Sequence, residues 1–221
     1  MNFARSLGVL LVGVLVLGGC DTSINSSIVV PDGESRSGPL TSVNGDVSIG
    51  KDCTIEGSSR SVNGSVKVGD RSKVEGLTTV NGLIRTGEGV SVDGNVESAN
   101  GSVEFGAGSE VSGKVTTANG SIKLDQTVVQ HDVRTVNGDI ELRDISVVKG
   151  NIVIEGNMGV STRRRPIEIE VTGGSIIEGD IVVKRNVDVS LILRDGGKVL
   201  GQVDGVEVIE ENVAQPAVDG D

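Results

Sequence analysis

One phrase recurs along the chain: SVNGDVSIG at 42–50, SVNGSVKVG at 61–69 and TVNGLIRTG at 79–87. Its Asn-Gly pair returns at spacings of 18 or 19 residues, with the asparagines at Asn44, Asn63, Asn81, Asn100, Asn119 and Asn137. A period of this length predicts a solenoid, in which each repeat forms one coil stacked on the next. We expect the six asparagines to lie at one turn and to form a hydrogen-bonded ladder along the axis.

A second column of turn residues runs half a repeat out of phase with the asparagines. Its members are Gly57, Gly76, Gly94, Gly113, Asp132 in place of glycine, Gly150, Gly179 and Gly201. Aliphatic residues step between the turns by about six, as in Val62, Val68, Val74 and Val80. We expect these side chains to point inward from three short strands per coil, with Val103 in the core between Ile84 and Ile122.

The composition favours strands and excludes several classes of protein. The 221 residues carry a net charge of -11 and include 33 Gly, two Phe, one His and no Trp or Tyr. A core without aromatics has to use Val, Ile, Ala and Thr, which favour strands. The acidic balance argues against binding to nucleic acid or to a bare anionic lipid surface. Frequent glycine argues against helical repeats, and the absence of proline between Leu40 and Arg165 suits backbone ladders on every face.

These patterns predict an all-β, single-domain parallel β-helix with about 18–19 residues per coil. The strict solenoid rhythm ends near Asn151, and NMGVSTRRRP at 157–166 is predicted to be a loop thrown out from a turn. The predicted organisation is a signal peptide at 1–19, a tether at 20–41, the β-helix at 42–211 and a flexible tail at 212–221.

The N-terminus, MNFARSLGVLLVGVLVLGGC at 1–20, has the order of an export signal: a positive residue, an apolar run and small residues. Its end, LGGC, resembles the lipobox of bacterial lipoproteins. That resemblance implies cleavage before Cys20, acylation of Cys20 with fatty acids such as palmitate, and anchoring to a membrane of the cell envelope. Asp21 then resembles the signal for retention at the inner membrane. An ordinary cleaved signal and a short buried helix are the alternatives.

The glycine-valine phrases also resemble a known family. VDGNV at 92–96, VSGKV at 111–115 and IEGDI at 177–181 are similar to repeats of bactofilin-type polymer-forming proteins and of adhesin-like envelope domains. The resemblance implies a right-handed β-helix with a scaffolding or self-associating role. The chain departs from the bactofilins in carrying an export signal. The hexad IGKDCT at 49–54 also resembles hexapeptide acyltransferases, but the extra residue per coil and the single His131 depart from that pattern.

No residue pattern points to catalysis, to a cofactor or to a metal. His131 lies where a turn glycine is expected, so we expect an outward side chain rather than a catalytic base. Cys53 is predicted to be a buried free thiol. Sugar-cleaving β-helices use aromatic platforms, and the mature chain has only Phe105, which we assign to the core. Arg163, Arg164 and Arg165 are a candidate contact for lipid headgroups or an acidic partner, and a solvated loop tip is the alternative.

The functional prediction is a non-enzymatic, lipid-anchored scaffold or self-associating β-helix of the cell envelope. An adhesin-like or partner-binding lipoprotein and a β-helix enzyme acting on carbohydrate or acyl groups are the alternatives. The ends of a β-helix expose strand edges, which makes a homo-oligomer through these ends a candidate assembly. The residues expected to form an apolar face at the C-terminal end are Val199, Leu200, Val203, Val206, Val208 and Ile209.

Overall fold

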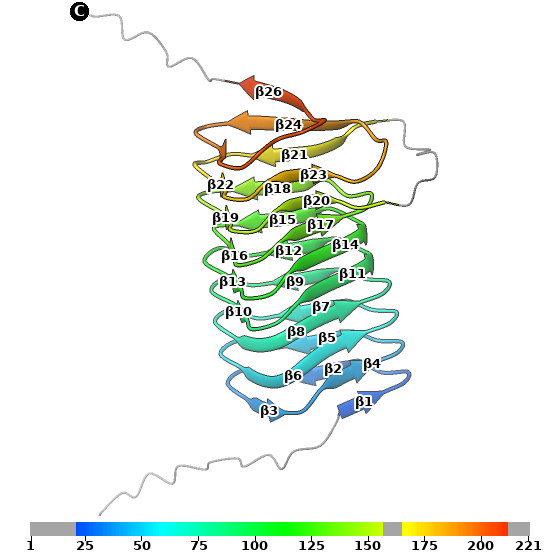
Figure 1. Cartoon of the computed structure of the whole chain (residues 1–221). Coiled ribbons are helices and arrows are strands. Elements are labelled where there is room, and N and C mark those ends of the chain that lie inside the picture. The colour runs from blue at the N-terminus through cyan, green and yellow to red at the C-terminus, as the bar shows by residue number, and fades with distance from the viewer. Residues whose placement is uncertain (1–20, 157–164, 212–221) are drawn as a thin grey trace, which may run out of the picture.

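The computed structural model describes residues 21–156 and 165–211, and in these residues every regular element is a β-strand (Figure 1). The strands stack in parallel as a β-solenoid of about 10 turns with about 19 residues per coil. The predicted fold class is therefore confirmed, whereas the right-handed sense of the coil stays a prediction. No helix in the described residues is long and apolar enough to cross a membrane.

One side of the solenoid is a ten-stranded sheet, in which each coil contributes one strand. From the N-terminal to the C-terminal end its strands are β2 (Ile28–Val30), β5 (Val47–Ile49), β7 (Val66–Val68), β9 (Ile84–Thr86), β12 (Val103–Phe105), β15 (Ile122–Asp125), β18 (Ile140–Arg143), β21 (Ile167–Val171), β24 (Val189–Arg194) and β26 (Glu207–Glu211). All of these neighbours pair in parallel, so each position of the strand forms a column along the axis.

The other two sides belong to a sixteen-stranded sheet. Its strands are β1 (Asp21–Ser23), β3 (Ser35–Ser37), β4 (Leu40–Ser42), β6 (Thr54–Ser61), β8 (Lys73–Thr79), β10 (Ser91–Val92), β11 (Val96–Asn100), β13 (Glu110–Val111), β14 (Val115–Asn119), β16 (Val128–Val129), β17 (Val133–Thr135), β19 (Val147–Val148), β20 (Ile152–Ile154), β22 (Ile176–Ile177), β23 (Ile181–Val183) and β25 (Lys198–Val199). The long strands β6 and β8 run around a corner and join the two sides, which separate further up the stack.

The core is built from columns of aliphatic side chains, as the repeat predicts. Val103 is fully buried and pairs in register with Ile84 in the coil below and Ile122 in the coil above. Its neighbour Glu104 points outward, where Arg85 holds its carboxylate at 2.6 Å. A coil of like sequence on each side covers the same apolar column and satisfies the same backbone groups.

The prediction that the valine before each asparagine points inward is wrong. Val62 and Val80 are 38% and 39% exposed, and the buried residues are the preceding Ser61 and Thr79. Each hydroxyl donates a hydrogen bond of 2.8 Å to a glycine carbonyl of the coil below. The turn leaves this carbonyl without a strand partner, and a small hydroxyl satisfies it inside the core. An aliphatic residue at the same place would leave the carbonyl unpaired.

The expectation of a tether at 20–41 is wrong for residues 21–41, which form the first coil and the start of the second. Asp21 pairs with Leu40 and Ile28 pairs with Val47, so β1 and β2 are full members of the stack. The stretch TSINSSIVV at 22–30 matches TSVNGDVSI at 41–49, with serine in place of glycine. Pro31 and Pro39 lie outside the strands, where a missing N–H removes no ladder hydrogen bond.

The second turn column also needs a correction of register. Because Val133 lies over Val115 and under Ile152, the residue aligned with Gly113 is His131 and not Asp132. Lower in the stack, Val96 pairs with Leu77, which places Gly94 over Glu75 rather than over Gly76. Differences of one residue in turn length move a residue out of a glycine column without disturbing the strands on either side.

Candidate functional site

The most extended polar feature of the structure is a ladder of asparagines at one turn. Each side-chain Nδ2 donates to the Oδ1 of the asparagine one coil below, at 2.9–3.0 Å. The rungs are Asn25, Asn44, Asn63, Asn81, Asn100, Asn119 and Asn137, so the predicted ladder is present with one additional rung at its base. At the top, Arg185 Nη2 donates to the Oδ1 of Asn137 at 2.9 Å. The amides therefore bind one another along the rod.

Above the first coil, where Ser26 follows Asn25, the glycine after each asparagine is required by close packing of successive turns. A Cβ built on Gly101 would lie 1.8 Å from the carbonyl oxygen of Gly82, and a Cβ on Gly82 would lie 2.2 Å from that of Gly64. Any side chain would force the coils apart. The Asn-Gly phrase thus repeats because the asparagine joins neighbouring coils and the glycine lets them approach.

An aliphatic stripe lies on the outside beside the asparagine ladder. It consists of the residue before each asparagine: Ile24, Val43, Val62, Val80, Ala99, Ala118 and Val136. Val62 and Val80 are more than a third exposed, and Ile24 in the first coil is the most exposed of the three. This stripe is an apolar surface that follows one side of the rod.

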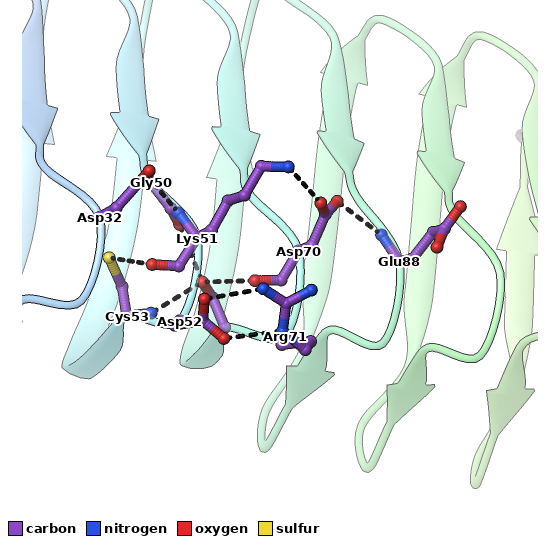
Figure 2. Close-up of polar contacts among 9 residues, drawn as sticks. Asp32, Gly50, Lys51, Asp52, Cys53, Asp70, Arg71 and Glu88 are labelled. Atoms are coloured by element: carbon purple, nitrogen blue, oxygen red, sulfur yellow. Dashed lines mark hydrogen bonds and ion pairs between the residues drawn. The ribbon is translucent and has the colours of Figure 1, made fainter.

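A buried column of small, mostly hydroxyl side chains lies inside the turn where Figure 2 shows Cys53. Ser72 Oγ donates to the Gly50 carbonyl at 2.8 Å and accepts a hydrogen bond from the amide of Cys53 at 3.0 Å. The same column continues with the buried Val90, which interrupts the hydroxyls, and then with the buried Ser109, Thr127, Ser146 and Ser175 higher in the stack. The thiol of Cys53 stands in this column, buried as predicted, and donates to the Pro31 carbonyl at 3.1 Å. Cys53 therefore occupies a position that serine fills in most of the other coils and that valine or threonine fills at Val90 and Thr127.

We expect Cys53→Ser to leave the stability nearly unchanged, within about 1 kcal/mol, because the shorter hydroxyl can make the bond that Ser72 makes one coil above. Cys53→Leu at the same site should cost ~1–3 kcal/mol, because its extra volume has no room beneath the next coil. Thermal unfolding of the two variants checks this. A serine variant as unstable as the leucine variant would contradict a structural role shared with the hydroxyl column.

Charged residues cover the outside of the same turn and pair between coils (Figure 2). Lys51 Nζ lies 2.7 Å from Asp70, and Arg71 Nε lies 2.8 Å from Asp52. The hydrogen bond from Lys51, assisted by the amide of Glu88, lowers the pKa of Asp70 below its usual value. The hydrogen bond from Arg71 lowers the pKa of Asp52. These pairs are solvated, so they add little to stability and tie the outer surface of adjacent coils together.

His131 is exposed at the turn opposite the asparagines, as predicted, and its Nδ1 lies 2.8 Å from the Ser112 carbonyl. Beside it, Asp132 accepts a hydrogen bond from the Asn151 amide at 3.0 Å and one from Arg134 at 2.7 Å. Burial is the largest single influence on Asp132 and would raise its pKa, but the two hydrogen bonds together with the positive charges of Arg134 and Lys114 outweigh it, so the pKa is lowered. The carboxylate is thus held as an anion that joins two coils, and it accepts no hydrogen bond from His131 in the described contacts.

Of the three arginines predicted to contact lipid headgroups or an acidic partner, Arg165 alone lies within the described residues. Arg165 Nη2 lies 2.6 Å from Asp139, and Arg165 Nη1 lies 3.9 Å from Glu168. Arg165 therefore binds carboxylates of its own chain. Arg163, Arg164 and the predicted lipidation site Cys20 lie outside the described residues.

In residues 21–156 and 165–211, no group of three or more His, Cys, Asp or Glu side chains is placed to hold a metal ion. A shallow, open depression of about 590 Å³ lies where β6 and β8 bend around the corner. Lys73 and Asp93 pair across it at 3.1 Å. Its remaining lining comes from Thr54, Ile55, Glu56, Val74 and Glu75.

Comparison of the chain with protein-family models, with curated proteins and with solved structures found no match. The chain is a parallel β-solenoid. This identification rests on strand pairing, and the likeness to bactofilin-type and adhesin-like repeats rests on the glycine-valine phrases alone. In the solenoid, the polar groups that sequence reasoning missed are the two buried hydroxyl columns. For the column of Ser61 and Thr79, the recurrence of Ser or Thr two residues before each asparagine was the available signal.

Proposed function

We propose that the protein is a non-enzymatic, lipid-anchored spacer of the cell envelope, anchored through Cys20. The observation that carries this proposal is the unbroken stack from Asp21, the residue after Cys20, to β26 at the opposite end (Figure 1). Ten stacked strands have nine spacings of ~4.8 Å, which gives a rod of ~43 Å. One end of this rod would carry the anchor and the other would be held away from the membrane. Asp21 favours the inner membrane, by the resemblance to lipoprotein sorting signals.

The placement of the polar side chains supports a structural role. The amides of the asparagine ladder bind one another, and the buried hydroxyls of Ser61 and Thr79 bind turn carbonyls. Many surface charges pair between coils, as Arg85 does with Glu104 and Lys67 with Asp46. Groups used in this way stiffen the rod, because each contact joins a residue to the coil below or above it.

We expect Cys20→Ala to prevent acylation and to move the protein from the membrane fraction to the soluble fraction. The reason is that two or three acyl chains give stable anchoring, which the variant would lose. Incorporation of radiolabelled palmitate and membrane fractionation measure both effects. Cys53→Ser is the matched control, because it removes the other thiol and should leave labelling unchanged. Palmitate incorporation into the Cys20 variant would contradict the proposed anchor.

A second candidate function, self-association, is favoured by the C-terminal end of the rod. β26 pairs with β24 along one edge, and Leu200 and Val208 near this end are 66% and 49% exposed. Val199, Val203 and Val206, which we expected on the same apolar face, instead pack partly buried against the core. The strand also carries Glu207, Glu210 and Glu211, so two copies meeting there would bring carboxylates together.

If the ends associate, residues 21–221 form at least a dimer at tens of micromolar, and the dimer becomes stronger as salt screens the carboxylates. Analytical ultracentrifugation at low and high salt measures this. Leu200→Lys and Val208→Lys should yield monomers, whereas Ile145→Lys, at an exposed aliphatic residue on the side of the rod, should not. A wild-type monomer at both salt concentrations would end this second proposal and leave the spacer function intact.

A further inference from the structure

The first coil of the rod begins without any spare chain after the proposed anchor. Asp21 directly follows Cys20 and already pairs with Leu40 in β4. Its carboxylate is also held by Arg36 Nη1 at 3.1 Å. Consecutive Cα atoms are ~3.8 Å apart, so acyl chains on Cys20 would bring β1 to the membrane surface.

We propose that the first coil, residues 21–39, is a base that lies in the headgroup layer of a phospholipid membrane. This proposal rests on the lipid anchoring proposed above. The interfacial layer into which apolar side chains insert is ~5–10 Å deep. One coil rises ~4.8 Å, so the layer has room for the first coil and part of the second.

The side chains of the base suit this position. Ile24 and Val29 are 65% and 66% exposed, and they project from different sides of the first coil. In the coils directly above, the outward column that begins with Val29 continues as Ser48, Lys67, Arg85, Glu104, Lys123, Glu141 and Glu170. The column is thus apolar at the base, polar through the middle of the rod and apolar again at Ile192 and Ile209, where Ile209 is only 36% exposed against 66% for Val29. A membrane at the base would cover side chains that water otherwise surrounds.

The charge of the base indicates which lipids an insertion experiment should use. Residues 21–39 contain Asp21, Asp32, Glu34 and Arg36, so the base carries more negative than positive charge. Electrostatic attraction to anionic lipids is therefore not expected, and apolar insertion should be seen on zwitterionic phosphatidylcholine.

The absence of tryptophan from the chain allows a direct test. Ile24→Trp places the only tryptophan at the base. The control, Ile145→Trp, replaces an exposed isoleucine that follows β18, the seventh strand of the ten-stranded stack and about 29 Å above β2. The acylated full-length proteins are reconstituted into phosphatidylcholine vesicles with and without brominated acyl chains, and the mass of the N-terminal peptide is measured on the same samples.

We expect brominated lipid to quench the tryptophan at position 24 at least threefold more strongly than the tryptophan at position 145, with a blue shift only for the former. An acylated protein with equal, weak quenching at both positions would overturn the base and leave the anchor standing. A peptide mass without acyl chains would overturn the anchor, and the base with it. Strong and equal quenching at both positions would also overturn the proposal, because the rod would then lie on its side.

Discussion

Val103→Asp is expected to unfold the middle of the rod. Val103 is fully buried between Ile84 and Ile122, and a carboxylate there would have no partner among these aliphatic neighbours. Burying an unpaired charge costs several kcal/mol, about 3–5 here. The adjacent coils would also lose part of their template, because each coil contacts only its neighbours. Thermal unfolding should show a fall in melting temperature of about 10 °C or more.

The control for this change is Glu104→Gln, one residue along the same strand. Glu104 faces outward and binds Arg85 at 2.6 Å, so the control removes one partly solvated ion pair and should cost at most about 1 kcal/mol. A lysine at this position would be a poor control, since it would stand beside Arg85. Equal melting temperatures for the two variants would contradict the assignment of Val103 to the inward side of β12 and of Glu104 to its outward side.

Gly101→Ala is the second change with a large expected effect. Its Cβ would lie 1.8 Å from the Gly82 carbonyl oxygen, and that oxygen belongs to backbone that cannot rotate away. The turn would have to move, which would stretch the bond between Asn100 and Asn81 in the ladder. We expect a loss of about 3 kcal/mol or more, at the upper end of overpacking costs, measured by urea unfolding.

Gly76→Ala provides the matched comparison for the turn. Its Cβ would lie 3.3 Å from the Asn95 carbonyl oxygen and 3.4 Å from the Ser58 hydroxyl, so small shifts can accommodate it. We expect a change below about 1 kcal/mol. If the alanine variants at 76 and 101 unfolded at the same urea concentration, close approach of the turns would not be the reason for the Asn-Gly phrase.

The strand columns could be predicted from the sequence because one physical requirement repeats in every coil. Val over Val and Asn over Asn follow from stacking, and both the core position of Val103 and the asparagine ladder are confirmed. The first coil was missed because Ser26 replaces the turn glycine and two prolines suggest a linker. At the end of a stack, fewer turns are packed from both sides, so the sequence constraint that marks a repeat is relaxed.

The turns were harder to predict than the strands because several solutions satisfy the same carbonyl groups. Ser61 or Thr79 points inward where valine periodicity favours Val62 or Val80, and only hydrogen bonding to the turn explains that choice. The turn between β15 and β16 is one residue shorter than the matching turn in the coil below, so the strands that follow it are aligned one residue earlier and His131, not Asp132, lies over Gly113. The repeat does not predict what the exposed surface does. Outward side chains only have to be compatible with water and with the charges beside them, so their identity is not constrained by stacking.

The central claim is that the rod stands on the membrane and holds its C-terminal end away from it. The direct measurement is resonance energy transfer from a dye at Leu200→Cys to acceptor-labelled lipids, in the acylated protein with Cys53→Ser as background. A dye at Ile24→Cys marks the base. Position 200 follows β25, eight spacings of ~4.8 Å above the first coil, so with the base inserted in the headgroup layer the account predicts a height of about 30 Å above the lipid surface, while the dye at position 24 transfers nearly all of its energy. Equal transfer from both positions would contradict the account, because a rod lying along the membrane would not act as a spacer.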